Sequence, residues 1–258
     1  MRVDLNADMG ESFGPWRMGD DAALLRTVTS ANVACGGHAG DADVMAATMT
    51  IAQANGVGIG AHPGFMDLAG FGRNRISVPR TTLQNQIRYQ VAASVGVARS
   101  LGAKVRHLKL HGAVSNMASE DPTLARDLYE AALSVDPDLI IMILAATAQQ
   151  QAVEELGCTW AGEIFADRAY NDDATLVDRS IEGAVMHDPK VAGARMVEMV
   201  KAGAIITNSG KHIPASIDTI CLHGDTPTAV QIAQSVRASL KAAKITVQTF
   251  QGRTSTNS

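Results

Sequence analysis

The sequence lacks long hydrophobic runs and clusters of basic residues. No apolar stretch reaches the ~20 residues that a membrane span needs, and the opening MRVDLNADMGE carries acids where a secretion signal would be apolar. The 22 Lys and Arg residues are outnumbered by 26 Asp and Glu residues, which gives a net charge of −4. This balance argues against nucleic acid as the main ligand. We therefore expect a cytoplasmic protein that binds neither nucleic acid nor membrane.

Cysteines and standard catalytic motifs are also scarce. Cys35, Cys158 and Cys221 are far apart and form no Cys-x-x-Cys pair, a pattern that suits a reducing compartment and matches no zinc signature. The chain contains no GxxxxGK[ST] loop, GxSxG elbow or HExxH helix, and no GxGxxG turn follows a strand. No standard motif therefore predicts nucleotide binding by this chain.

Aromatic residues make up only 4% of the chain, whereas small and β-branched residues are plentiful. Such residues suit strands that helices cover on both faces. Apolar runs alternate with helical patterns, which predicts an α/β fold with a parallel sheet. We expect strands at 2–6, 30–35, 57–61, 105–110, 139–144, 163–166 and 219–222, and an edge or closing strand at 245–250.

The chain length favours closure of this sheet. About seven strand–helix units within 258 residues fit a parallel β/α barrel, closed or nearly closed, in a single domain over 1–250. The polar tail 251–258 is expected to be disordered. The stretches 175–187 and 205–215 break the alternation and predict short hairpins that cover one end of the barrel. Helices are expected at 41–54, 81–101, 122–133, 145–156 and 226–243.

Polar residues gather where the predicted strands end. They are Asn6, Asp8 and Glu11; His38 and Asp41; His62; His107, Lys109 and His111; Glu163, Asp167 and Arg168; and His223 and Asp225. In a parallel barrel all strand carboxyl ends share one face, where active sites are assembled. A lone histidine there is more often a structural residue than a catalyst, and Asp41 could simply cap a helix. Six polar strand ends in one chain nevertheless predict a functional site at this mouth.

Side-chain alternation indicates which of these residues point inward. Along the fourth strand His107, Lys109 and His111 share one face, opposite Leu108 and Leu110. If the leucines face the helices, the lysine lies inside the barrel, where it requires acidic partners or a ligand. Asp8, Glu11 and Asp225 are the acids that we expect to reach it.

Several ordered motifs resemble the LamB/YcsF family. They are DLNADMGE (4–11), SANVACGGHAGD (30–41), GAHPGF (60–65), DLAGFGR (67–73), KLHGA (109–113), EIFADRAY (163–170) and ICLHGD (220–225). The resemblance implies a deformed β/α barrel related to sugar hydrolases and polysaccharide deacetylases. It also implies the A subunit of an ATP-dependent 5-oxoprolinase, which acts with B and C subunits to open 5-oxo-L-proline to L-glutamate. Met66, Leu110 and Ser115 depart from the family pattern, which has Pro, Pro and Tyr at these positions.

Hydrolysis of an activated lactam needs a general base, an oxyanion stabiliser and a proton donor. We expect Asp8 or Glu11 as the base, Lys109 as the stabiliser, and His38, His62, His111 or His223 as acid or substrate holder. Substrate binding is expected from Asn6, Asn32, Glu163, Asp167, Arg168, His223 and Asp225. ATP is expected for the complex, without indication of which chain binds it, and both a divalent metal and a homo-oligomer remain open.

Two other functions are compatible with the same residues. One is a metal-dependent deacetylase or amidohydrolase with Asp8, His38 and His62 as ligands. The other is a non-catalytic binding subunit that shapes a partner's site. Metal content distinguishes the first alternative, and the activity of complexes with substituted Lys109 or His111 distinguishes the second.

Overall fold

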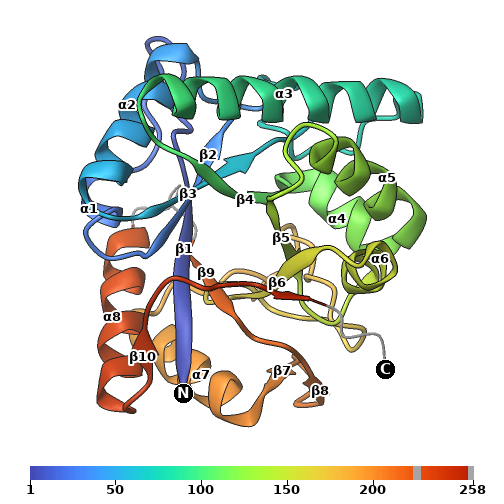
Figure 1. Ribbon diagram of the computed structural model, residues 1–258. Coiled ribbons are helices and arrows are strands. Elements are labelled where there is room, and N and C mark those ends of the chain that lie inside the picture. The colour runs from blue at the N-terminus through green and yellow to red at the C-terminus, as the bar shows by residue number, and fades with distance from the viewer. Residues whose placement is uncertain (223–227, 255–258) are drawn as a thin grey trace.

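A computed structural model describes residues 1–222 and 228–254. Its centre is a closed barrel of parallel strands, in which each strand pairs with the next and β9 pairs with both β6 and β1 (Figure 1). The barrel strands are β1 (Arg2–Met9), β2 (Ser30–Ala34), β3 (Gly58–His62), β4 (Val105–Lys109), β5 (Ile140–Leu144), β6 (Thr159–Phe165) and β9 (Thr219–Leu222). The predicted parallel barrel of about seven strands is therefore confirmed.

The helices lie outside the barrel (Figure 1). They are α1 (Asp21–Leu24), α2 (Ala42–Ala54), α3 (Arg80–Ser100), α4 (Gly112–Glu120), α5 (Pro122–Leu133), α6 (Ala148–Leu156), α7 (Pro189–Ala202) and α8 (Ala229–Ala242). Asp41 caps α2 by accepting hydrogen bonds from the backbone amides of Asp43 and Val44. The sequence analysis did not identify α7, although Asp188 caps its start and Gly203 ends it in a left-handed conformation. Among the described helices none is long and apolar enough to cross a membrane.

The two predicted hairpins have different outcomes. The stretch 205–215 does form one, in which β7 (Ala204–Ile206) pairs antiparallel with β8 (His212–Pro214). The stretch 175–187 does not, and the prediction there was wrong. It is an irregular loop with only isolated bridges, because Asp173 and Asp178 accept hydrogen bonds from amides two residues on and turn the chain instead.

Two short strands extend the sheet at its margins. β10 (Thr246–Val247) pairs parallel with the start of β1, so it is an edge strand, and the barrel is closed by β9. β11 (Arg253–Thr254) pairs antiparallel with β6. The guanidinium of Arg253 also binds the carboxylate of Asp218. The expected disorder of the tail therefore does not hold for these two residues.

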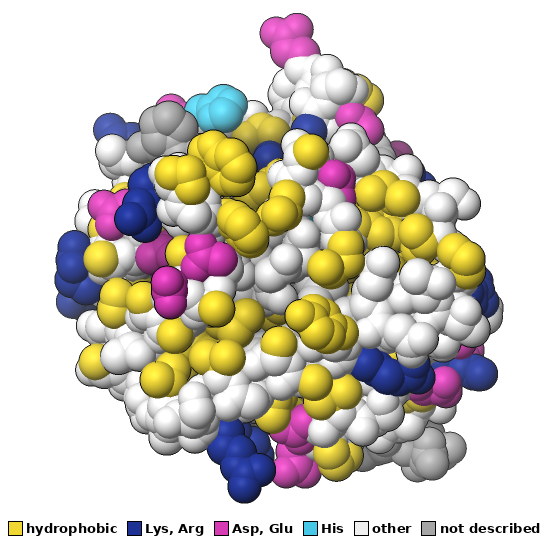
Figure 2. Space-filling model, turned by 90° about the horizontal axis from the view of Figure 1, so that it is seen from above, with side chains coloured by type: hydrophobic (Ala, Val, Ile, Leu, Met, Phe, Trp, Pro, Cys, Tyr) yellow, Lys and Arg dark blue, Asp and Glu magenta, His cyan; other side chains and the backbone are white. Residues whose placement is uncertain are grey.

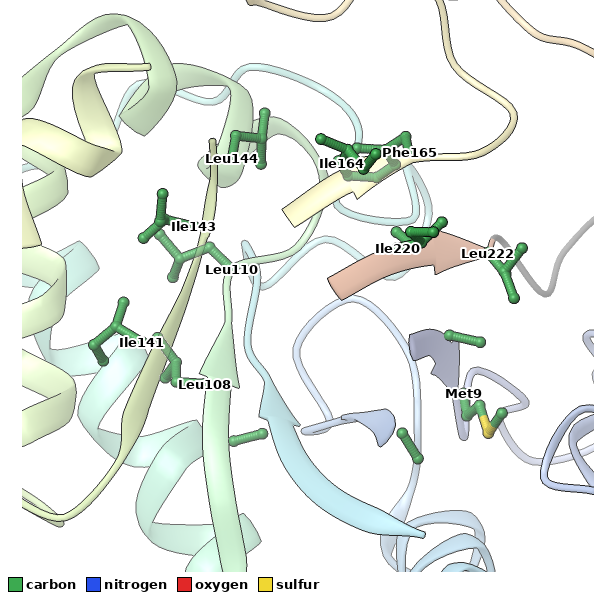
Figure 3. Close-up of a cluster of buried hydrophobic side chains, with 14 of the residues drawn as sticks. Met9, Leu108, Leu110, Ile141, Ile143, Leu144, Ile164, Phe165, Ile220 and Leu222 are labelled. Atoms are coloured by element: carbon green, nitrogen blue, oxygen red, sulfur yellow. The ribbon is translucent and has the colours of Figure 1, made fainter. Parts of the chain in front are cut away.

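The main apolar core lies between the strands and the helices, and a smaller cluster of Ile140, Met142, Ala161 and Phe250 is separate from it. Figure 3 shows Leu108 of β4 and Leu110, which follows this strand, beside Ile141 and Ile143 of β5, and all four side chains are buried. Burial of apolar surface in this layer supplies the main driving force for folding. The predicted outward direction of the two leucines is therefore confirmed. On the surface, Figure 2 shows acidic and basic side chains interspersed on one face, with no basic stripe there.

Several polar side chains lie inside the barrel, and most of them are paired. Ser30 and Thr29 donate hydroxyl hydrogens to Asp4 Oδ1 over 2.8 and 2.6 Å, and the side-chain amide of Asn6 donates to the Thr219 hydroxyl over 2.8 Å. Gly60 leaves room for a histidine, because a Cβ atom there would lie 2.1 Å from His107 Nε2. Pairing offsets the cost of burying these polar groups.

Candidate functional site

A cavity of about 650 Å³ opens at the carboxyl ends of the strands. Of the predicted site residues, Asp8, Glu11, His62, Lys109, His111 and Arg168 line it. Loops that follow β3 and β6 complete the wall, and the residues 171–181 of the irregular loop form much of its rim. His223 and Asp225 lie outside the described residues. The cavity lies at the mouth that active sites occupy in parallel barrels.

Three histidines and one glutamate converge at this mouth. The rings of His38 and His111 stack with their centroids 3.5 Å apart, and the ring of His62 stands edge-on to both. Glu11 Oε1 lies 3.1 Å from His38 Nε2 and 3.6 Å from His111 Nδ1. Burial, with further repulsion from neighbouring imidazoles, lowers the pKa of His38 and of His111 well below the usual value. Both rings are therefore neutral at pH 7 and can act as metal ligands.

Backbone carbonyls determine the tautomers of two of these rings. His62 Nδ1 donates to the Lys109 carbonyl and His111 Nε2 donates to the Phe71 carbonyl, each over 2.8 Å. The nitrogens left over, His62 Nε2 and His111 Nδ1, are 3.0 Å apart. In neutral rings both carry lone pairs, which repel unless a proton or a metal ion lies between them. Backbone carbonyls that orient ring N–H groups in this way are typical of metal-binding histidines.

The donor set fits a divalent cation. One ligand atom from each of Glu11, His38, His62 and His111 lies within 4.8 Å of the others. His38 Nδ1 is also buried and has no hydrogen-bond partner among the described residues, so a ligand could use it. The cluster shares His38 and His62 with the expected metal-ligand set, but it lacks Asp8 and adds Glu11 and His111.

A strained segment presses against the histidines. Phe71 adopts a φ of 52°, which is unusual for a bulky residue, and this conformation accompanies the hydrogen bond of its carbonyl to His111. At Gly72 an added Cβ would lie 2.8 Å from His38 Cβ and 2.9 Å from His111 Cδ2. Only glycine allows this close approach.

Lys109 is the centre of a second, neighbouring network. Its Nζ atom lies 2.9 Å from Asp8 Oδ1, 3.0 Å from Glu163 Oε1 and 3.0 Å from Cys221 Sγ. Burial disfavours the charged amine, but the two carboxylates outweigh burial and raise the pKa of Lys109 well above its usual value. Burial raises the pKa of Glu163, an effect that Lys109 opposes. The expectation that acids reach the lysine is thus met by Asp8 and Glu163, whereas Glu11 contacts the histidines.

Asp8 is held from below by the Asn32 amide, which the imidazole of His107 supports in turn. The Asn32 side-chain amide donates to Asp8 Oδ1 over 2.9 Å and to Asn6 Oδ1 over 2.7 Å, and its oxygen accepts from His107 Nε2 over 2.8 Å. Burial lowers the pKa of His107 to about 3, so this ring is neutral. Asn6, Asn32 and His107 are fully buried beneath the cavity and support Asp8. Substrate contact was expected for Asn6 and Asn32, but their burial beneath the cavity favours a structural role.

Other contributors were not identified from the sequence. Gln90 of α3 is completely buried, accepts from the Gly64 amide over 3.1 Å and donates to the Gly64 carbonyl over 2.8 Å. It therefore positions the loop that follows His62. One feature of the sequence could have indicated this role: Gln90 lies on the same face of α3 as the buried residues Ile87 and Ser94.

Four arginines line the cavity. They are Arg73, Arg75, Arg168 and Arg179, of which only Arg168 was predicted from the sequence. Glu163 and Asp167, expected to bind substrate, are buried at 1% and 3% exposure and do not belong to the described lining. Arg73 ends the motif DLAGFGR, whereas Arg75 and Arg179 lie in none of the motifs, and the folded chain brings them to one cavity.

Comparisons with known proteins agree with these motifs. The chain is 67% identical to a protein of Ruegeria pomeroyi that is named as the A subunit of 5-oxoprolinase, over 97% of this chain and 99% of that protein. It is 51% identical to a protein of the same name from Rhodopseudomonas palustris, over 96% of this chain and 98% of that protein.

Solved structures support the same fold. A lactam utilization protein from Thermus thermophilus superposes with a TM-score of 0.90 at 35% identity, covering 97% of this chain and 100% of that chain. A polysaccharide deacetylase from Bacillus cereus, at 13% identity and a TM-score of 0.50 over 97% of this chain and 93% of that chain, shares the barrel alone. The LamB/YcsF family model matches residues 3–255. The chain therefore belongs to the LamB/YcsF family.

Proposed function

We propose that this chain is the A subunit of a cytoplasmic, ATP-dependent 5-oxoprolinase that opens 5-oxo-L-proline to L-glutamate. The observation that carries the proposal is the 67% identity to a 5-oxoprolinase A subunit over nearly the whole of both chains. The proposed partners are B and C subunits. The charged residues at the barrel mouth supply groups that such a hydrolysis needs.

The chemistry explains why ATP is required. The carbonyl carbon of a five-membered lactam is a poor electrophile, and transfer of a phosphoryl group to its oxygen makes that carbon open to attack. Water then adds to the carbon, the bond from carbon to nitrogen breaks, and the nitrogen takes up a proton, which leaves an acyl phosphate. A second water hydrolyses this acyl phosphate to the side-chain carboxylate of glutamate and inorganic phosphate. Hydrolysis thus needs a base for the water, a cation beside the oxygen and a donor for the nitrogen.

We assign the base to Asp8 and the cation to Lys109. Asp8 Oδ1 is engaged by Asn32 and Lys109, while Oδ2 lies 3.4 Å from His62 Nε2. Asp8 is therefore held in one orientation and lines the cavity. Lys109 keeps its positive charge through its two carboxylate partners, so it can stabilise a developing oxyanion without reorganisation. Glu11 is the alternative base, and a neighbouring histidine is the proposed proton donor.

We further propose that Glu11, His38, His62 and His111 hold a divalent cation. Three imidazole nitrogens and one carboxylate favour a transition metal such as zinc over magnesium or calcium. When bound, such an ion acts as a Lewis acid towards an oxygen of the substrate. The same ligand cluster favours a second candidate function, a metal-dependent amidohydrolase or deacetylase that needs no ATP.

Reconstitution distinguishes these functions. The purified chain is mixed with candidate B and C proteins, and glutamate release from 5-oxo-L-proline is measured with and without ATP. We expect turnover only when all components and ATP are present, with little or none from the isolated chain. Release without ATP favours the amidohydrolase, and no release under any condition contradicts the proposed function.

A matched pair of variants tests whether this chain is catalytic. Asp8→Asn should abolish turnover of the reconstituted complex, whereas Asp138→Asn, whose side chain is 74% exposed, should leave it unchanged. Full activity of a complex that contains Asp8→Asn would indicate a chain that binds but does not catalyse.

A further inference from the structure

The four arginines that line the cavity, Arg73, Arg75, Arg168 and Arg179, differ in how deeply they are buried. Arg168 is buried at 5% exposure, Arg179 is half-buried, and Arg73 and Arg75 are exposed. Arg75 is paired with Glu120, which lines the same side. Arg168 differs from the others because its cationic group sits in the protein interior, where each unmet donor is costly.

Few of the donors of Arg168 are occupied by this chain. Its Nη2 atom donates to the Val177 carbonyl over 2.7 Å, while its Nε atom is buried without a hydrogen-bond partner among residues 1–222 and 228–254. A guanidinium has five N–H donors in a planar fork, which matches two oxygens of a carboxylate or a phosphate. An oriented guanidinium with spare donors beside a cavity is a feature of anion sites.

The other cations reinforce this charge. Burial, with repulsion from Arg179 and Arg73, lowers the pKa of Arg168 to about 10, so both of these guanidinium groups lie within electrostatic reach of Arg168. Asp167 offsets part of this repulsion, and Asp178 lines the same cavity but uses its Oδ1 atom to hold Ser180. A bound anion reduces the electrostatic repulsion between neighbouring cations of this kind.

We propose that Arg168, with Arg73 and Arg179, forms an anion subsite that binds the carboxylate or phosphoryl oxygens of a small ligand in the cavity. The subsite lines the same cavity as Asp8, Lys109 and His111, so a ligand held by the arginines lies beside these groups. Assigning the anion to 5-oxo-L-proline or to its phosphorylated form rests on the proposed function, whereas the subsite itself rests on the arginines.

Calorimetric titration of the full chain tests the subsite without any need for turnover. The probes are inorganic phosphate, 5-oxo-L-proline, and pyrrolidin-2-one, which keeps the lactam but lacks the carboxylate. We expect at least one of the two anions to bind, with an affinity that falls as salt is added. Binding of phosphate identifies a phosphoryl group as the anion, and binding of 5-oxo-L-proline but not pyrrolidin-2-one identifies the carboxylate.

Variants tie that binding to the arginines. Arg168→Lys keeps the charge but loses the fork, and Arg179→Gln changes a half-buried residue that is less important for folding. Each should weaken anion binding about 10-fold or more, while Arg126→Gln, an exposed residue of α5 paired with Glu130, should not. Thermal melting shows whether each variant is folded.

The proposal is overturned if neither anion binds, or if an anion binds equally well to the folded Arg179→Gln and Arg168→Lys variants. Should Arg168→Lys fail to fold, Arg179→Gln alone decides. Anion binding by the chain without glutamate release from the complex would retain the subsite and reject the proposed function.

Discussion

His62 Nε2 and His111 Nδ1 face each other across 3.0 Å, and each ring donates its other N–H to a backbone carbonyl. In the neutral state neither ring has a hydrogen to place between the two atoms. The repulsion between the lone pairs is removed if a cation lies near both nitrogens. Glu11 and His38 complete the donor set around that position.

The first prediction is that the purified chain binds a divalent transition metal. Mass-spectrometric metal analysis after dialysis against zinc should find close to one ion per chain, and the ion should raise the melting temperature because it binds only the folded protein. His62→Ala and Glu11→Gln should each lose the ion. His212→Ala, which changes an exposed residue of β8, should retain it, and equal metal content in all four proteins would contradict the site.

The second prediction concerns Lys109, which separates two buried carboxylates. Lys109→Met should lower the free energy of unfolding by about 3–5 kcal/mol, because Asp8 and Glu163 lose their shared cation. Turnover of the reconstituted complex should fall about 100-fold or more. The double variant Lys109→Met with Glu163→Gln should recover much of the stability but not the turnover. Urea unfolding and activity are measured on the same preparations, and normal turnover in the single variant would reject the catalytic assignment.

The third prediction concerns pH and Asp4. Burial raises the pKa of this carboxyl from 3.8 to about 6, against the opposing effects of hydroxyl donors and Arg106. Because the folded-state pKa is the higher one, the folded protein binds more protons between these values. The contribution of Asp4 to stability is therefore greatest below about pH 4 and falls by about 3 kcal/mol as the pH rises to 6.

Asp4→Asn should remove this component of the pH dependence. Urea unfolding at several pH values between about 4 and 7 should show a flatter profile for Asp4→Asn than for the unchanged chain. Asp138→Asn, at an exposed site, serves as the control and should keep the original slope. Identical slopes for all three proteins would show that Asp4 does not titrate in this range.

The fourth prediction tests the loop after β3. Gln90→Leu leaves the Gly64 amide and carbonyl without their partner, which should lower the free energy of unfolding by about 1–3 kcal/mol. Gln84→Leu changes another glutamine of α3 that is only partly buried and should have a much smaller effect. Equal losses would mean that Gln90 contributes only packing.

Much of the fold was predictable because strand periodicity is a local property. Alternation along β4 separated His107 and Lys109 from Leu108, and the structure has the leucine in the outer apolar layer and the other two inside. The convergence of His38, His62 and His111 followed from the parallel direction of their strands. Loop shape was less predictable, since side-chain hydrogen bonds such as those of Asp173 and Asp178 decide how a loop turns.

By itself, the sequence determined which residues lie at the mouth of a parallel barrel, because apolar periodicity and strand ends can be identified one segment at a time. Only the tertiary structure decided which of them are partners. Glu11 contacts the histidines while Glu163, from the far side of the barrel, joins Asp8 on Lys109. Arg73, Arg168 and Arg179 line one cavity because the loops that follow β3 and β6 fold over it. Distances across a barrel depend on register and loop path, and neither is encoded within any single segment.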